Sequence, residues 1–387
     1  MKTLQYFLII FTTCFFIACN NDTDPTDDGT DVIENPDDDQ TNDDDDNSDE
    51  TAMYFPPTDS DTWETADLTA LNWNEDKLEA LYTSLEENDT RAFIILKDGK
   101  IAVEKYFGLN GLETENFNKD SNWYWASAGK TIISFAIGLA QQQNYLDINN
   151  KTSEYLGVGW TNLNQEKEDL ITVKHQLSMT TGLDYDVSNE NCTEPICLNY
   201  SADAGDEWYY YNAPYILLRD VISGATNQDY KTYIEENIED KIGMSSAFWF
   251  GIDDLTLYWS NARDMARFGL LVLNKGTWDD TEILTDSNYF EEMTTTSQDL
   301  NDAYGYLWWL NGKDSVIYPA TTFVLNQELA SNAPDDMIAA IGKNGQFIDV
   351  VPSENMVVIR MGEAPSDALV PILFHNEMWA LINDVIN

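Results

Sequence analysis

Histidine is almost absent from this chain, which has only His175 and His375 among 387 residues. A serine nucleophile usually passes its proton to a histidine, and the G-x-S-x-G turn that often presents such a serine does not occur here. The sequence therefore argues against a histidine-based triad. We interpret His175 as a helix-packing residue rather than a catalytic base.

Basic residues are scarce as well, with 20 Lys and Arg against 69 Asp and Glu, and a formal net charge of −49. A nucleic-acid partner is therefore not expected, because binding phosphates requires a basic surface. Residues 20–50 contain fifteen of the acids, no Lys or Arg, and few apolar residues. Such a segment cannot bury enough surface to order itself, so residues 19–53 are predicted to be a disordered acidic tether.

The chain has four cysteines, of which Cys14 lies before this tether and Cys19 is its first residue. The other two, Cys192 and Cys197, are predicted to form a small loop-closing disulfide if the protein is exported. Two thiols without a neighbouring histidine do not make a zinc site. We expect neither a metal nor a cofactor.

Long apolar runs are limited to Leu4–Ile17, which follows Lys2 and is short for a membrane span. The run ends in Phe16-Ile17-Ala18-Cys19, which resembles a bacterial lipobox. That resemblance implies a signal peptide at residues 1–18 and a lipid on Cys19. The mature protein would then be anchored in the cell envelope, facing the periplasm or the cell surface. The alternative is an ordinary signal peptide with an incidental cysteine.

Among the residues that are present, Ser127-Ala-Gly-Lys130 is the one S-x-x-K sequence in the chain. On a helix, residues i and i+3 share a face, so the amine can approach the hydroxyl. In a dry site the pKa of a lysine falls, and the amine can then act as a base. The alternative is a helix-capping serine followed by a surface lysine.

The residues that follow favour the chemical interpretation. Apolar residues recur after Lys130 at helical spacing and cover most of the circumference, which predicts a buried helix. The preceding Trp123-Tyr124-Trp125 is aromatic. The pair is thus predicted to lie at the start of a buried helix beneath aromatic side chains.

Strand patterns occur near both ends of the chain. Short β-branched and apolar runs separated by turn residues are predicted to be strands at 92–96, 101–107, 337–341, 346–351 and 356–361. Helices are predicted at 73–85, at 367–385, and after Ser260-Asn261. We therefore expect an α/β (α+β) fold over residues 54–387. Its antiparallel sheet combines both chain ends, helices flank it, and a mostly helical lobe is inserted at roughly 110–320.

Two further clusters could complete a site with Ser127 and Lys130. In Tyr210-Tyr-Asn212, a phenol and an amide two residues apart could relay a proton and orient a substrate; their alternative role is a pocket wall. Lys343-Asn-Gly345, followed by Gln346, could place a positive charge at the same opening; its alternative is an ordinary polar hairpin.

The ordered set S-x-x-K, Y-x-N and K-x-G resembles the serine β-lactamase and penicillin-binding D,D-peptidase superfamily. The tyrosine of the second motif is similar to the class C branch and its esterase and 6-aminohexanoate-dimer hydrolase relatives. Similar stretches extend from His175-Gln-Leu-Ser-Met-Thr-Thr-Gly-Leu183 to Gly345-Gln-Phe-Ile-Asp-Val-Val-Pro352. The resemblance covers nearly everything after the tether and implies a β-lactamase/D,D-peptidase-like fold.

The resemblance also implies roles for individual residues. Ser127 would be the acylated nucleophile, Lys130 and Tyr210 would share the proton transfers, and Asn212 would contact the substrate and Lys130. Lys343 would make Tyr210 easier to ionise. The backbone N–H groups of Ser127 and of Gln346, which follows Gly345, would form the oxyanion hole.

We therefore expect a serine hydrolase that acts as a monomer on a small ester or amide through an acyl-enzyme. Asn344 stands where lactam enzymes usually have threonine or serine, which favours esters and amides over lactams. The alternatives are a D,D-carboxypeptidase or β-lactamase, and a non-catalytic binding lipoprotein at the cell surface. Aromatic pocket walls are expected from Trp208, Tyr209, Trp308 and Trp309.

Overall fold

The computed structural model describes residues 53–252, 255–368 and 370–387. The predicted signal peptide, Cys19 and nearly all of the predicted acidic tether lie outside the described residues. In the described part of the chain, no helix combines the length and the apolar character that crossing a membrane requires.

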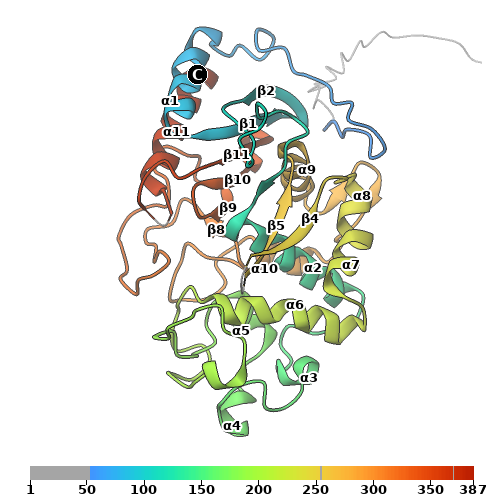
Figure 1. Cartoon of the computed structure of the whole chain (residues 1–387), viewed down its shortest axis with the longest axis vertical. Helices are drawn as coiled ribbons and strands as arrows, with labels where there is room; N and C mark the ends of the chain where they lie inside the picture. The colour runs from blue at the N-terminus through green and yellow to red at the C-terminus, as the bar shows by residue number, and fades with distance from the viewer. Residues whose placement is uncertain (1–52, 253–254, 369) are drawn as a thin grey trace, which may run out of the picture. The chain divides into compact units, whose positions relative to one another are not determined.

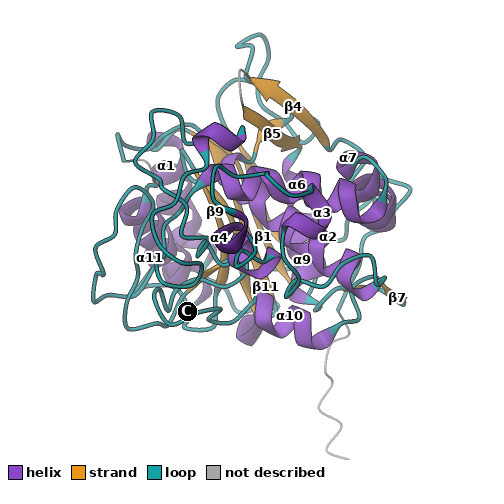
Figure 2. Cartoon of the chain, turned by 90° about the horizontal axis from the view of Figure 1, so that it is seen from below, coloured by secondary structure: helices purple, strands orange, loops and turns teal. Residues whose placement is uncertain are grey.

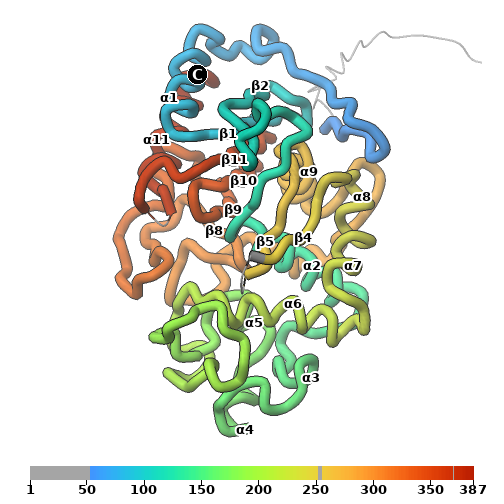
Figure 3. Tube along the Cα trace, viewed as in Figure 1, coloured from blue at the N-terminus to red at the C-terminus, as the bar shows by residue number. Residues whose placement is uncertain are grey.

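The central element is a six-stranded antiparallel sheet whose strands come from both ends of the chain (Figures 1 and 3). In spatial order these strands are β2 (Lys100–Tyr106), β1 (Thr90–Lys97), β11 (Met356–Gly362), β10 (Gln346–Val351), β9 (Ile338–Gly342) and β8 (Trp309–Leu310). Strand β1 pairs with β11, so the first and last thirds of the chain meet in the middle of the sheet. The predicted fold class is confirmed.

The hairpin turn between β1 and β2 lies at the two residues that predicted it. Asp98 and Gly99 join β1 to β2 with φ of +50° and +80°, a left-handed pair that suits a two-residue hairpin. All residues of β10 and β11 are buried, which explains why these strands are nearly continuous apolar runs.

Helices cover both faces of this sheet (Figure 2). Phe347 of β10 stacks on Phe374 and His375 of α11 (Ile372–Ile386), which packs beside α1 (Leu78–Glu87). The next residue, Ile348, faces Gly269 of α9 (Ala262–Leu273). Because successive strand residues point to opposite faces, α11 and α9 lie on opposite sides of the sheet.

The remaining helices form most of the middle of the chain, with α6 (Asn212–Thr226) packed against α2 (Lys130–Gln142), α3 (Ser153–Leu156) and α5 (Val173–Leu177). The others are α4 (Gln165–Glu168), α7 (Tyr230–Ile234), α8 (Asp240–Ile242) and α10 (Ser287–Met293). Helix α9 lies within the sequence range predicted for the inserted lobe, yet it packs on the central sheet. That range is therefore not wholly a separate helical layer.

A second, three-stranded sheet was not predicted from the sequence. It has the order β3 (Trp123–Tyr124), β5 (Leu255–Ser260) and β4 (Phe248–Ile252). Strand β3 directly precedes the segment that carries Ser127, and the Trp125 N–H donates to the carbonyl of Tyr258 in β5. This small sheet therefore holds the N-terminal side of the site. A 3-10 turn, Glu75–Lys77, precedes α1, and a short two-stranded ribbon joins β6 (Thr277–Trp278) to β7 (Thr281–Glu282).

Candidate active site

Ser127 lies in a 3-10 turn, Ala126–Gly129, that leads directly into α2. The sequence placed it on the helix itself. In a 3-10 turn, residues i and i+3 are eclipsed, so Lys130 stands almost directly over Ser127. Ala126, just before the serine, has a φ of +48°, a left-handed conformation that is unusual for a residue with a side chain. Ser127 is half-buried and borders a cavity of about 400 Å³.

The Lys130 amine is the charged group nearest the serine. Its Nζ lies 3.0 Å from Ser127 Oγ and 3.0 Å from Asn212 Oδ1. Burial lowers the pKa of Lys130 to about 7, the nearby Arg219 adds to this effect, and Glu190 opposes it. A substantial fraction of the amine is therefore neutral at physiological pH and able to accept a proton.

Tyr210 lies on the other side of the amine, with Lys130 Nζ 4.9 Å from the centre of its ring. Burial raises the pKa of Tyr210 above its usual value, and its interaction with the Ser127 hydroxyl offsets this in part. Burial is the main cause and favours the protonated phenol. The role expected for Lys343, which was to make Tyr210 easier to ionise, stays a prediction.

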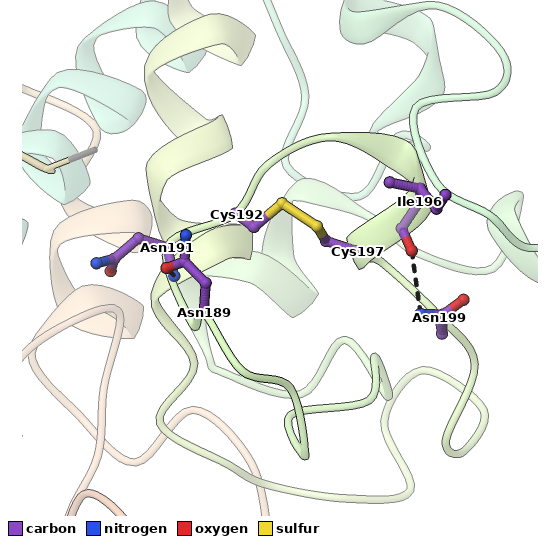
Figure 4. Close-up of a disulfide and its surroundings, with 6 residues drawn as sticks. All are labelled: Asn189, Asn191, Cys192, Ile196, Cys197 and Asn199. Atoms are coloured by element: carbon purple, nitrogen blue, oxygen red, sulfur yellow. Dashed lines mark hydrogen bonds between the residues drawn. A yellow bond between two sulfur atoms is a disulfide. The ribbon is translucent and has the colours of Figure 1, made fainter. Parts of the chain in front are cut away.

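Asn212 is held in place by the loop that carries the disulfide, residues 189–199, which we call the disulfide loop. The bond between Cys192 and Cys197 forms as predicted (Figure 4). The neighbouring Asn191 accepts a hydrogen bond from Asn212 Nδ2 through its Oδ1, at 3.1 Å. An amide that donates on one side presents its carbonyl oxygen on the other, so this contact turns Asn212 Oδ1 toward Lys130.

Loss of this support should reduce activity. We expect Asn191→Ala to lower kcat by about 5-fold, because a hydrogen bond that orients Asn212 contributes about 1 kcal/mol. Cys192→Ser, or a reducing agent added to the wild type, should act in the same direction by loosening the loop. Steady-state rates on one p-nitrophenyl ester, with and without reductant, measure both effects.

Asn199→Ala is the matched control within the same loop. Its side chain donates to the carbonyl of Ile196 at 3.2 Å, on the other side of the disulfide from Asn191 (Figure 4). An equal loss in Asn199→Ala and Asn191→Ala would show that general loop stability, rather than the orientation of Asn212, is responsible.

The end of β9 forms the wall opposite the nucleophile. A Cβ added to Gly342 would lie within 3.0 Å of the Trp125 carbonyl oxygen and would approach the Ala128 nitrogen to 3.0 Å. The backbone of β9 therefore runs directly against the turn that carries Ser127, at a distance that only glycine permits.

This arrangement corrects the prediction for Gln346. Gln346 begins β10, pairs with Gly342 of β9, and so lies one strand farther into the sheet than β9. Its side chain is fully buried and makes two hydrogen bonds with the backbone of Gly362, at 2.6 and 3.0 Å. Neither Gln346 nor Gly345 borders the cavity. Gln346 therefore anchors the sheet rather than binding substrate.

Lys343 and Asn344 do border the cavity, on the turn that follows β9. Lys343 is exposed, as expected for a charge at the opening, and Asn344 Nδ2 donates to the Tyr124 hydroxyl at 2.7 Å. The buried guanidinium of Arg360 donates to the carbonyls of Asn344 and Gly345, which fixes the turn. Among the described residues, the backbone N–H groups of Ser127 and Lys343 have no hydrogen-bond partner.

A methyl group at position 342 should disturb this contact. Gly342→Ala is expected to lower kcat/KM by about 10- to 100-fold, because a displacement of the nucleophile by about 1 Å is costly in rate. Gly111→Ala is the control, since its added Cβ would make an ordinary 3.5 Å contact with Trp123. Ester turnover and thermal melting should be measured together. Full activity in Gly342→Ala would show that β9 does not position the nucleophile.

The walls of the cavity differ in part from the prediction. Trp309 borders the cavity and stacks on Tyr210, with ring centres 5.9 Å apart. The other three predicted residues do not border the cavity: Trp208 and Trp308 are buried in the core, and Tyr209 stacks on Tyr185. The sequence also missed several wall residues on α6, the disulfide loop and β5: Glu190, Tyr215, Arg219, Leu255, Thr256, Leu257 and Tyr258. The alternating pattern of residues 248–260 could have indicated β4 and β5.

His175 does not border the cavity. Its Nδ1 accepts from the Thr172 N–H at 3.1 Å, which caps α5, in agreement with a structural role. In the described part of the chain no three His, Cys, Asp or Glu side chains are grouped as a metal site would require.

A family model matches most of the chain. The family model described as Beta-lactamase matches residues 85–367, which include the nucleophile turn, α6 and β9. An uncharacterised protein of Alkalihalophilus pseudofirmus is 20% identical over 298 residues, which is 69% of this chain and 81% of that protein.

Two solved structures have a similar fold. A putative 6-aminohexanoate-dimer hydrolase from Bacillus anthracis is 18% identical, with a TM-score of 0.63 over 85% of this chain and 89% of that one. A putative beta-lactamase from Bacteroides dorei is 16% identical, with a TM-score of 0.64 over 81% of this chain and 99% of that one.

Proposed function

The chain belongs to the Beta-lactamase family, as its motifs predicted, and we propose that it cleaves an ester or amide through an acyl-enzyme on Ser127. The observation that carries this proposal is the position of a partly neutral Lys130 amine 3.0 Å from Ser127 Oγ, on the border of a cavity. A serine next to an available base is the arrangement that nucleophilic catalysis needs.

In the first step the neutral amine of Lys130 takes the Ser127 proton as Oγ bonds to the substrate carbonyl carbon. The carbonyl oxygen becomes an oxyanion, and its collapse breaks the bond to the leaving group. Tyr210, which burial keeps protonated, is suited to supply a proton to the departing alkoxide or amine. The proton on Lys130 passes to the Tyr210 phenolate, which restores both groups. Water then attacks the acyl carbonyl carbon while Lys130 takes its proton, and collapse of the new oxyanion returns that proton to Ser127 Oγ and releases the carboxylic acid.

The developing oxyanion needs hydrogen-bond donors. We assign this role to the N–H groups of Ser127 and Lys343, in place of the Ser127 and Gln346 pair expected from the sequence. Both N–H groups lack other partners among the described residues, and β9 lies against the nucleophile turn. Each such donor typically lowers the barrier by about 3 kcal/mol.

Ester and amide cleavage is favoured over lactam cleavage by the turn after β9. Asn344, which replaces a hydroxyl residue, directs its amide to Tyr124 and so offers no hydroxyl to the substrate. The second candidate, a D,D-carboxypeptidase or β-lactamase, is favoured by the family itself. A non-catalytic binding protein is disfavoured by the intact contacts among Ser127, Lys130 and Asn212.

A panel of p-nitrophenyl esters, short anilides and the chromogenic lactam nitrocefin tests the proposal. We expect turnover of the esters, slower turnover of anilides and little of nitrocefin. A fluorophosphonate probe should add one adduct to the protein, and peptide mass spectrometry should find it on Ser127. Nitrocefin turnover that exceeds ester turnover would instead favour the β-lactamase candidate.

We also propose that the enzyme is held at the cell envelope through a lipid on Cys19. This rests on the lipobox-like sequence, and the acidic stretch after it would separate the enzyme from the membrane. Cys19→Ser should move the protein from the membrane fraction to the soluble fraction. Unchanged membrane association would refute the anchor without affecting the catalytic proposal.

A further inference from the structure

A buried guanidinium on the wall of the cavity has no direct ion-pair partner in the described residues. Arg219 lies on α6, borders the same cavity as Ser127, and is only 6% exposed. It forms no ion pair with any described carboxylate and interacts only at longer range with its chain neighbour Asp220, which is exposed. A buried charge without a partner is costly, so its presence beside a substrate cavity calls for a functional reason.

The contacts of Arg219 hold the group in place without neutralising it. Nη2 donates to the Tyr215 hydroxyl at 3.0 Å and to the Thr256 carbonyl at 2.9 Å. The guanidinium carbon lies 4.8 Å from the centre of the Trp249 ring. The Tyr230 ring also lies against the guanidinium, with its centre 5.8 Å from Cζ, and Nε is buried without a hydrogen-bond partner. These neighbours fix the orientation of the side chain, and none of them is a carboxylate.

The position of Arg219 relates it to the reacting atoms. Asn212, Tyr215 and Arg219 are spaced i, i+3 and i+7 along α6, so they lie on one face of the helix. Both basic groups lie close to the Tyr215 ring, with Lys130 Nζ at 4.4 Å and Arg219 Cζ at 5.2 Å from its centre. The guanidinium thus shares an aromatic neighbour with the amine that contacts Ser127.

We propose that Arg219 binds a carboxylate at the end of the substrate's acyl chain, so that the preferred substrates are esters or amides of acids with a second, distal carboxylate. A guanidinium is well suited to bind a carboxylate through charge-assisted hydrogen bonds. We place this carboxylate on the acyl part of the substrate rather than on the leaving group, because Arg219 is buried. The leaving group would depart past Lys343 and Glu190, which border the cavity and are exposed. This inference rests on the proposed hydrolase function.

The test compares two esters that differ only at the end of the acyl chain, mono-p-nitrophenyl adipate and p-nitrophenyl hexanoate. Wild type should prefer the adipate ester, and Arg219→Met should lower the ratio of the two kcat/KM values by about 10- to 100-fold. Arg219→Lys should restore part of the ratio. Because both substrates share the same chemistry, the ratio cancels any change in the pKa of Lys130.

Lys343→Met is the matched variant, since it removes the exposed basic side chain that borders the cavity and should leave the ratio unchanged. The inference is overturned if the ratio is the same in Arg219→Met and wild type, or if it collapses in Lys343→Met instead. If Arg219→Met does not fold, the rates of the wild-type enzyme on two series of esters test the inference. Equal rates on carboxylate-ended and methyl-ended esters, over acyl chains from adipate to suberate, would refute the inference.

The two proposals fail differently. Turnover of both esters by wild type, but not by Ser127→Ala, without any carboxylate preference would refute the Arg219 assignment and leave the hydrolase intact. Turnover that is equal in wild type and Ser127→Ala would refute the hydrolase proposal and the Arg219 assignment with it.

Discussion

Replacing Ser127 with alanine is expected to reduce the turnover of p-nitrophenyl esters by roughly 10⁴- to 10⁶-fold, because no covalent intermediate can then form. The residual rate would come from binding and from the two backbone N–H donors. The fluorophosphonate adduct should disappear from the intact-mass spectrum at the same time. Burst kinetics under excess substrate, if deacylation is slow, should disappear as well.

Ser134→Ala provides the control for this variant. Ser134 lies on the same helix, α2, is fully buried, and its hydroxyl has no hydrogen-bond partner, so alanine should cost little stability and no activity. The assignment of Ser127 would be refuted if Ser127→Ala kept a wild-type rate or still carried the adduct.

The second large effect is expected at Lys130. Because burial lowers the pKa of Lys130 to about 7, the reactive neutral amine is lost below that pH. For a neutral ester, kcat/KM should therefore rise through pH 7 and then stay level. Tyr210 should not limit the rate near neutrality, since burial raises its pKa. A rate that was flat between pH 5 and 9 would contradict the role of the amine.

Lys130→Gln should lose about 10²- to 10⁴-fold in kcat and lose the pH-dependent limb near 7 as well. The pH dependence of stability offers an independent readout. Above pH 7 the Lys130 amine is largely neutral in the folded protein, whereas it stays protonated in the unfolded chain. The free energy of unfolding of the wild type should include a term that rises by up to about 1.4 kcal/mol per pH unit between pH 7 and 10. Lys130→Met should lack this term, which denaturant titrations at two pH values can measure.

The strands near the chain ends could be predicted because their signals are local. Asp98 and Gly99 both adopt a positive φ, which few other pairs of residues do readily, so the dipeptide marks a hairpin turn. Strands β10 and β11 are apolar because both of their faces are covered. The contact between Ser127 and Lys130 was also predictable from spacing alone. These features depend on residues that are close together in the sequence.

The errors concern partners that are distant in the sequence. Gln346 was assigned to the oxyanion hole because it follows a recognisable motif, but strand order decides which backbone reaches the nucleophile, and that strand is β9. Arg219 was missed because a single cation in a helical sequence looks like a surface residue. Only the packing of α6 against α2 and β5 shows that it is buried beside the cavity.

The pairing of β1 with β11 has a consequence for when activity can arise. The nucleophile at position 127 needs the wall provided by β9, more than 200 residues later, and β9 is held in the sheet by β10 and β11. A chain that is still emerging from the ribosome therefore carries Ser127 and Lys130 without an assembled site. Hydrolysis is expected to begin only after the C-terminal strands have been synthesised and have paired with β1.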